Sequence, residues 1–222
     1  MNGLVDTYSL QFALFGSQAP GRMTHKRIID VILALFGIIV LSPVFLICFI
    51  LTKVSSPGPA VFRHRRVGFN GSHFDCLKFR TMVTDAPERL HKLLESDPVA
   101  AAEWAACRKL RRDPRVTAVG SIFRKLSLDE LPQLFNVLNG DMSIVGPRPV
   151  TDEELERYSS SVSAYLACRP GITGLWQVSG RSTTTYEERV AHDAFYARNW
   201  SMALDAKILV LTVPALLSDT AF

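Results

Sequence analysis

The chain has 222 residues, with 25 Lys and Arg against 21 Asp and Glu, and a formal net charge of +4 at pH 7. This length suits one domain, with or without an anchor, and the positive balance favours an anionic partner: a phosphate, a nucleic acid or an acidic lipid surface. The four cysteines are widely spaced, with no C-x-x-C pair and no histidine at zinc-ligand spacing, which argues against a disulfide framework and a structural zinc site.

Residues 1–25 form a lead to which we assign no function. The segment 1–21 contains no cation before Arg22, and no small-residue cleavage site follows an apolar run. It therefore does not have the pattern of a secretory signal. Its apolar residues suit contact with a membrane surface, and its terminal position suits disorder equally well.

An apolar segment runs from residue 28 to residue 52 and carries one charged residue, Asp30. It is long enough to cross a hydrocarbon core of about 30 Å. Ser42 and Pro43 lie at its centre, where a proline removes a backbone hydrogen bond and kinks a helix. Cations occur at both ends of the run, whereas a crossing helix biases them to one side. A spanning helix and a re-entrant helix both stay open, with a buried helix of a soluble domain as a third alternative.

The residues after this segment predict a β-hairpin. Alternating apolar and polar residues occupy 61–69 and 74–80, on either side of the turn pair Asn70-Gly71. Lys78 and Arg80 lie on one face of the second strand, from which we expect them to reach a diphosphate. The arginines at 63, 65 and 66 suit a solvated or lipid-headgroup patch.

Helices are predicted over residues 84–94, 97–112, from 152 onward, 185–199 and 200–217. The last one suits an interfacial helix on a bilayer as well as a packed core helix, with Leu204, Ile208 and Leu211 on one stripe. Residues 169–181 predict a glycine-rich loop and a short strand. Their glycines permit either close approach of the backbone to a ligand or a tight structural turn with Trp176 in the core.

The stretch 127–149 puts two adjacent acids at the predicted start of a helix. Ser127 and Glu130 have the spacing of a capping box, and apolar residues at 131, 134, 135 and 138 follow with helical periodicity. On such a helix Asp129 points away from the buried face, together with Gln133 and Asn136.

These acids allow two interpretations. In the first, Glu130 caps the helix and Asp129 complements its dipole. In the second, the acids divide the roles of nucleophile and metal ligand. Arg124 upstream and Arg148 downstream favour the second, because fixed cations beside carboxylates are what metal-assisted phosphoryl transfer requires.

A series of ordered motifs resembles those of the bacterial sugar transferases, the monotopic polyprenyl-phosphate phosphoglycosyl transferases. The likeness extends from residue 26 to the C-terminus. The motifs are KRIID at 26–30, SP at 42–43, RVG at 66–68, KFRTM at 78–82, DPRVT at 113–117, SLDELPQ at 127–133, GDMS at 140–143, GPRP at 146–149 and RPGITG at 169–174.

The resemblance implies an α+β, mainly helical fold in a single domain with a short β-hairpin and amphipathic interfacial helices. Residues 26–54 would form a re-entrant membrane helix broken at Ser42-Pro43. Residues 55–222 would form the catalytic domain on the cytoplasmic face of the bacterial inner membrane.

The resemblance also implies an activity: Mg²⁺-dependent transfer of a hexose 1-phosphate, from UDP-glucose or UDP-galactose, to undecaprenyl phosphate, which starts exopolysaccharide synthesis. Asp129 would be the nucleophile that attacks the β-phosphate, Glu130 would bind Mg²⁺, and Arg124 would hold phosphate. The remaining substrate-binding residues it implies are Pro147 and Arg148, for the uridine diphosphate portion, and Asp193.

Two other classes of protein stay open. A non-catalytic, membrane-anchored scaffold of a polysaccharide assembly complex would need the acids only as caps. A basic nucleic-acid binder would need aromatic residues interleaved with the arginines at 63–66, and the apolar segment argues against it. We therefore expect a UDP-sugar, undecaprenyl phosphate and membrane lipid as partners, no nucleic acid, and leave a homodimer open.

Overall fold

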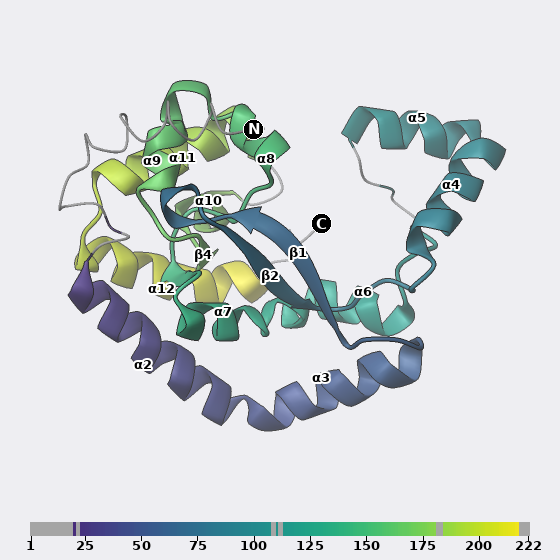
Figure 1. Ribbon diagram of the computed structural model, residues 1–222, viewed down its shortest axis with the longest axis horizontal. Coiled ribbons are helices and arrows are strands. Elements are labelled where there is room, and N and C mark those ends of the chain that lie inside the picture. The colour runs from purple at the N-terminus through teal and green to yellow at the C-terminus, as the bar shows by residue number, and fades with distance from the viewer. Residues whose placement is uncertain (1–19, 21–22, 108–109, 111–112, 181–183, 218–222) are drawn as a thin grey trace.

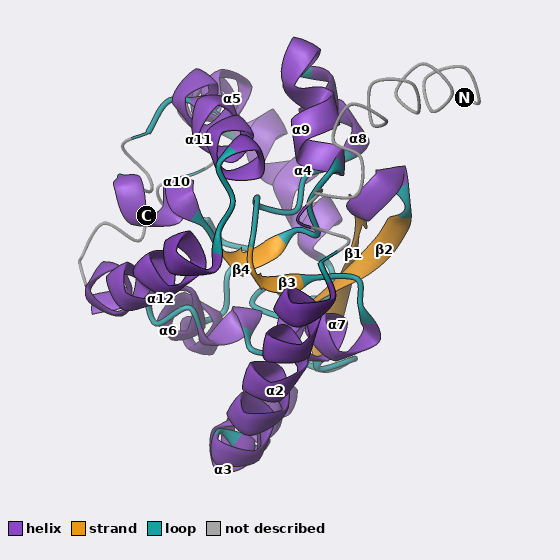
Figure 2. Cartoon of the chain, turned by 90° about the vertical axis from the view of Figure 1, so that its left-hand side faces the viewer, coloured by secondary structure: helices purple, strands orange, loops and turns teal. Residues whose placement is uncertain are grey.

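The computed structural model describes residues 20, 23–107, 110, 113–180 and 184–217. Most of the predicted N-terminal lead and the end of the predicted helix over 97–112 lie outside these ranges. The described chain is mainly helical with two small sheets (Figure 2), which confirms the α+β, mainly helical prediction.

The apolar segment forms two helices, α2 (Thr24–Val40) and α3 (Ser42–Ser55), bent by 65° at Leu41. Pro43 lies in the first turn of α3, where its missing N–H costs no helical hydrogen bond, and the Ser42 hydroxyl donates to the carbonyl of Ile39 at 2.8 Å. Among the described residues, no one helix has the length and apolar character to span a membrane, but the bent pair taken together does.

Polar residues at the start of α2 hold it against the rest of the domain. The ammonium of Lys26 lies 2.7 Å from a carboxylate oxygen of Asp205, and both side chains are buried. Arg27 donates to the last carbonyls of α7 (Gln133–Asn139), and Asp30 accepts from the N–H of Ile144 at 2.9 Å. Lys26 and Arg27, two of the cations that precede the apolar segment, therefore bind groups of the protein itself.

The predicted hairpin is present. Strand β1 (Val61–Val67) pairs antiparallel with β2 (His73–Phe79), and Val67 lies opposite His73. The connection is longer than the predicted two-residue turn, because Phe69–Gly71 form a 3₁₀ turn in which Asn70 adopts a φ of 56°. Arg80 lies just beyond β2, not within it.

In the view of Figure 1 the remaining helices lie above and below this hairpin, and α4 and α5 project from the body on one side. Their bounds are α4 Ala86–Ser96, α5 Pro98–Cys107, α6 Ala118–Lys125, α8 Asp152–Glu156, α9 Val162–Leu166, α10 Leu175–Ser179, α11 Tyr186–Arg198 and α12 Met202–Leu217, with 3₁₀ turns at Leu128–Glu130 (η4) and Ser159–Ser161 (η5). The predicted helix starts at 84, 97, 152, 185 and 200 agree with these to within a few residues.

A parallel pair of short strands, β3 (Ser143–Val145) and β4 (Gly171–Thr173), lies at the centre of the domain. Only β4 was predicted. A side chain at Gly146 would place its Cβ 2.3 Å from the carbonyl oxygen of Arg169, and one at Gly174 would come 2.1 Å from that of Gly146. These glycines therefore let two backbone segments touch, and Trp176 is buried, in agreement with the structural turn predicted here. The approach of a ligand to this backbone stays a prediction.

Helix α12 buries one face in the core and exposes the other. Ile208 is fully buried against α9 and α11, whereas Val210, Leu211 and Val213 are exposed. The predicted stripe of Leu204, Ile208 and Leu211 is therefore divided between the core and the surface. An apolar surface also covers α2 and α3, on which Ile32, Phe36 and Leu46 are each about 60% exposed.

Candidate active site

The two adjacent acids lie on the 3₁₀ turn η4 and not on a helix, so the capping-box prediction was wrong. Ser127 adopts a left-handed conformation with a φ of 54°, and its side chain caps nothing. Helix α7 begins only at Gln133, after Pro132. The carboxylate of Glu130 is instead engaged by a residue from the hairpin.

The predicted orientation of α7 was also wrong. Gln133 and Asn136 are each 2% exposed, whereas Phe135 is 42% exposed. The amide of Asn136 accepts from the N–H of Leu77 at 2.9 Å and donates to the carbonyl of Asp75 at 2.8 Å. Backbone groups at a strand edge need partners, so the buried amide completes the edge of β2 and fixes α7 and η4 beside it.

Lys78 on β2 holds the acidic pair. Its ammonium lies 2.6 Å from Glu130 Oε1 and 3.9 Å from Asp129 Oδ2. Burial opposes the ionisation of Glu130, but Lys78, together with Arg148 and Gln133, outweighs it and lowers the pKa of Glu130 below its ordinary value.

Asp129 is the more enclosed acid, with its side chain 13% exposed. Burial, reinforced by the negative charge of Glu130, raises the pKa of Asp129 to about 6, although Lys78 and Arg124 act in the opposite direction. The pKa values of the two neighbouring carboxyls are thus shifted in opposite directions, which is the condition for two acids to take different roles.

Arg124 reaches the pair from the last turn of α6. This helix starts at Thr117, whose hydroxyl accepts from the N–H of Gly120 at 2.9 Å. The guanidinium of Arg124 donates to the hydroxyl of Thr81 at 3.0 Å. Burial lowers the pKa of Arg124, and the charge of Asp129 opposes this shift, so Arg124 and Asp129 lie within electrostatic range of each other.

The charge of Arg148 acts on both the acidic pair and Asp193. It lowers the pKa of Glu130. Asp193 is 1% exposed and accepts a hydrogen bond of 2.7 Å from the hydroxyl of Tyr158. Burial raises the pKa of Asp193 to about 7, against that hydrogen bond and the two arginines Arg189 and Arg148.

Two of the predicted site residues, Pro147 and Arg80, form hydrogen bonds with backbone groups away from the acids. Pro147 is buried, and its carbonyl accepts from the N–H of Gly171 at 2.7 Å, which holds the loop that carries Arg148. The structure does not bring Arg80 to the acids. Its guanidinium donates to the carbonyls of Ser56 and Pro57 at 2.6 and 2.7 Å, where it closes the end of α3 onto the hairpin.

The structure therefore brings Lys78, Arg124, Arg148, Asp129 and Glu130 into one cluster, with Asp193 at its far side. Sequence reasoning missed Tyr158 and Arg189. Neither lies in a motif or at a periodic position that would single it out. Tyr158 lies between α8 and η5, Arg189 lies on α11, and only packing brings both to Asp193.

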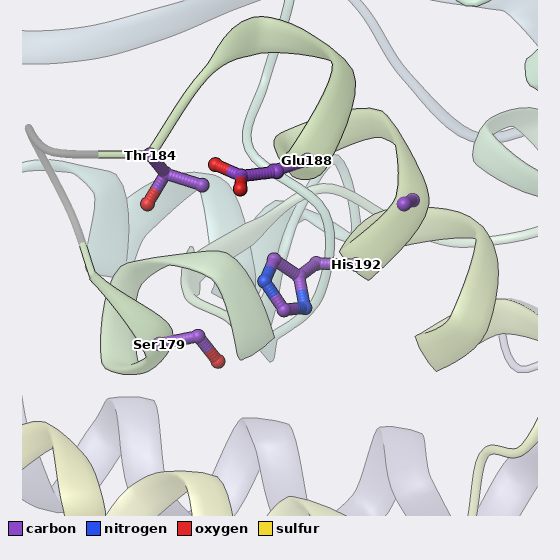
Figure 3. A pocket seen from close by; sticks show the side chains of 5 residues that line it. Ser179, Thr184, Glu188 and His192 are labelled. Atoms are coloured by element: carbon purple, nitrogen blue, oxygen red, sulfur yellow. The ribbon is translucent and has the colours of Figure 1, made fainter.

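Two cavities of the described chain lie away from this cluster. One of about 470 Å³ lies between α10 and α11 and is lined by Ser179, Thr184, Glu188, Ala191 and His192 (Figure 3). A smaller one of about 140 Å³, between α2 and α12, is bordered by the Lys26–Asp205 pair. None of the predicted site residues lines either cavity.

The carboxylates of the acidic pair are ligands of the kind that hold Mg²⁺ in enzymes that act on phosphates. Among the described residues, no group of three or more His, Cys, Asp or Glu side chains forms a metal cage. Mg²⁺ is usually held by one or two carboxylates, with substrate phosphate oxygens and waters completing its octahedron, and Asp129 and Glu130 supply such oxygens. The ammonium of Lys78 is the cation that contacts Glu130 in the structure.

The model of the family described as bacterial sugar transferase matches residues 21–219. The exopolysaccharide production protein ExoY of Sinorhizobium fredii is 52% identical over 214 residues, which is 94% of this chain and 95% of that protein. The undecaprenyl-phosphate galactose phosphotransferase of Salmonella typhimurium is 50% identical over 193 residues, or 86% of this chain and 40% of that protein.

A third relative is the UDP-glucose:undecaprenyl-phosphate glucose-1-phosphate transferase of Caulobacter vibrioides, 43% identical over 207 residues, or 89% of this chain and 72% of that protein. The family match covers both the bent helices and the cluster of acids and cations. The chain belongs to the bacterial sugar transferase family.

Proposed function

We propose that this protein transfers a hexose 1-phosphate from a UDP-sugar to undecaprenyl phosphate, with glucose or galactose as the sugar, and so starts exopolysaccharide synthesis. The observation that carries the proposal is the pair Asp129 and Glu130 beside Lys78, with Arg124 and Arg148 on either side. Relatives named for UDP-glucose and for galactose transfer to undecaprenyl phosphate support the substrate classes.

In the first step, an oxygen of the Asp129 carboxylate attacks the β-phosphorus of the UDP-sugar. The bond from that phosphorus to the oxygen bridging to the α-phosphate breaks, and its electron pair leaves with UMP. The product on the enzyme is a mixed anhydride between Asp129 and the sugar phosphate.

In the second step, a phosphate oxygen of undecaprenyl phosphate attacks the same phosphorus, the bond between that phosphorus and the Asp129 oxygen breaks, and its electron pair returns to the carboxylate. The lipid diphosphate sugar leaves and the carboxylate is restored. Two displacements at one site let a soluble donor and a membrane-bound acceptor react in turn.

The neighbouring residues divide the electrostatic work. Lys78 keeps Glu130 ionised, while Arg124 and Arg148 supply fixed positive charge where phosphate oxygens collect charge. Mg²⁺, when held by Glu130 with the substrate diphosphate, would neutralise phosphate charge and polarise the attacked phosphorus.

We further propose that α2 and α3 enter and leave the same leaflet, on the cytoplasmic face of the bacterial inner membrane. Both ends of the bent pair are attached to one domain: Lys26 and Asp30 hold the start of α2, and Arg80 holds the chain after α3. A crossing helix would separate these ends by a core about 30 Å thick. The exposed apolar residues Ile122, Leu126 and Phe135, near the acids, suit a site at the membrane surface.

A direct test is incubation of the purified protein, in lipid nanodiscs with Mg²⁺, with undecaprenyl phosphate and a panel of labelled UDP-sugars. We expect UMP and a lipid-linked sugar from UDP-glucose or UDP-galactose. If every UDP-sugar leaves the lipid unlabelled, the transferase proposal is wrong and the scaffold alternative is favoured. Without the lipid acceptor, mass spectrometry should find the protein heavier by one hexose phosphate. Product without this adduct would rule out the covalent route.

A further inference from the structure

Two arginines from separate elements meet at one tryptophan. Arg148 follows β3 and Arg189 lies in the second turn of α11, and their guanidinium carbons lie 5.6 and 4.2 Å from the ring centroid of Trp176. Arg189 also lies over Tyr186, at 5.4 Å. Flat guanidinium groups stack on aromatic rings, which holds them in place while their N–H groups remain free to donate.

These arginines lack the partners that buried cations ordinarily have. Within the described ranges, the guanidinium groups of Arg148 and Arg189 have no hydrogen-bond acceptor and no carboxylate within 4 Å. The Nε of Arg189 and the Nε1 of Trp176, in a side chain only 6% exposed, are buried donors without an acceptor there. Buried donors are nearly always satisfied, so this arrangement is complete only with an acceptor from outside the described chain.

The nearest acids are already engaged. Glu154 accepts from Arg66 at 2.7 Å, and Asp193 accepts from Tyr158 at 2.7 Å. Burial raises the pKa of Asp193 to about 7 despite both arginines, so it offers them only part of a negative charge near neutral pH. Burial lowers the pKa of Arg189, and the positive charge of Arg148 lowers it further. The two arginines are therefore like charges that repel each other. An anion between them would remove this repulsion.

The two arginines lie at different depths from the reacting acids. The charge of Arg148 lowers the pKa of Glu130, whereas Arg189 is not among the charges with the largest effect on that pKa and acts on Asp193. The order outward from the acidic pair is therefore Arg148 and then Arg189. A nucleotide sugar with its β-phosphorus at Asp129 has one more phosphate to place, the α-phosphate that leaves with UMP.

We propose that Arg189 binds this α-phosphate, beside Arg148 and on the platform of Trp176, and so recognises the leaving nucleoside monophosphate. The inference rests on the proposed function, because it takes the donor to be a UDP-sugar. When the bond between the two phosphates breaks, the bridging oxygen stays on the α-phosphate with the electron pair and an added negative charge. A guanidinium fork beside that phosphate is suited to the charge that develops.

The test compares the binding of UMP with the binding of uridine, because the two ligands differ only in the phosphate. Equilibrium dissociation constants are measured by calorimetry on the full chain in nanodiscs, without lipid acceptor. Arg189→Gln should weaken UMP binding about ten-fold or more while leaving uridine binding within about two-fold. Arg189→Lys, which keeps the charge but loses the fork, should weaken UMP less. Arg198→Gln removes an exposed cation from the same helix and should change neither constant.

Equal loss of UMP and uridine binding, or unchanged UMP binding in a folded Arg189→Gln protein, would overturn the inference and leave Arg189 a packing residue. Should Arg189→Gln fail to fold, as judged by its melting temperature, Arg189→Lys decides, and an unchanged ratio of the uridine and UMP constants contradicts the proposal. The transfer assay on the wild type is scored separately. Absence of lipid product with a phosphate-specific loss in Arg189→Gln would reject the transferase and retain the nucleotide site.

Discussion

Lys78 on strand β2 contacts both acids of the η4 turn, with its ammonium 2.6 Å from Glu130 and 3.9 Å from Asp129. A single cation thus compensates two adjacent carboxylates, of which it binds one directly. The hairpin and the acidic turn are in this way coupled, and the function of the pair depends on a strand far from it in sequence.

Replacement of Lys78 by Gln should therefore disable the site without unfolding the protein. Loss of its charge raises the free energy of the ionised pair, and we expect the transfer rate to fall about 100-fold or more. The measurement is UMP release at saturating UDP-sugar. Lys92→Gln, an exposed cation on α4, serves as the control, and equal activity of the two variants would contradict the role of Lys78.

Asp129→Asn should abolish both transfer and the phosphosugar adduct, because an amide is a poor nucleophile. It should leave membrane association intact, because asparagine has nearly the same shape as aspartate. Intact-protein mass spectrometry and sedimentation with membranes test the two halves of this prediction. Glu153→Gln, an exposed acid on α8, is the control. Wild-type turnover by Asp129→Asn would remove the nucleophile assignment.

Pro43→Ala should straighten the junction of α2 and α3. It restores a backbone donor and removes a ring that a continuous helix does not accommodate, so the pair moves toward a spanning helix. A cysteine introduced before Thr24 should then become more accessible to a membrane-impermeant reagent from the periplasmic side. Val44→Ala keeps Pro43 and should leave labelling as in the wild type. Equal labelling of all three proteins would speak against the re-entrant arrangement.

Asp193→Asn should change how stability depends on pH. The folded pKa of Asp193 is raised to about 7, so the folded state holds a proton that the unfolded chain releases above pH 4. Its contribution to the free energy of unfolding is full below about pH 4 and is lost as the pH rises through 7, with a slope of at most about 1.4 kcal/mol per pH unit. Asparagine keeps an acceptor for Tyr158 and carries no charge.

Chemical denaturation at pH 5 and pH 8 checks this prediction. The stability of Asp193→Asn relative to the wild type should be higher at pH 8 than at pH 5. The same difference at both values would mean that Asp193 is ionised throughout this range in the folded protein.

Gly120→Ala should destabilise the segment that carries Arg124. The added Cβ would lie 2.1 Å from the carbonyl oxygen of Thr81, a backbone atom that has no room to move away. We expect a loss of about 1–3 kcal/mol in the free energy of unfolding, together with reduced transfer activity. Ser121→Ala changes an exposed neighbour and should change neither quantity.

Local patterns in the chain were sufficient for much of the fold. The turn pair Asn70-Gly71 between alternating strands predicted the hairpin, and Thr185 with Glu188 forms the capping box that starts α11. Ser42-Pro43 marked the bend between α2 and α3. Each of these depends on neighbours within a few residues, where backbone sterics and side-chain caps decide the outcome.

The same local rules failed at the acidic pair. Ser127 and Glu130 have capping-box spacing, yet Glu130 binds Lys78, 52 positions away in the chain, and Ser127 adopts a left-handed conformation. Asn136 looked solvent-facing by helical periodicity but is buried, because the open edge of β2 needs its amide. Arg80 has the charge expected of a phosphate ligand but satisfies backbone carbonyls instead.

The sequence by itself determined the family, the elements with strong local signals and the residue types of the site. The tertiary structure alone decided which of those residues meet: Lys78 with the acids, Arg148 with Trp176, and Tyr158 with Asp193. The physical reason is that helical periodicity, turns and caps act over a few residues, whereas ion pairs and buried hydrogen bonds join any residues that packing brings within about 3 Å.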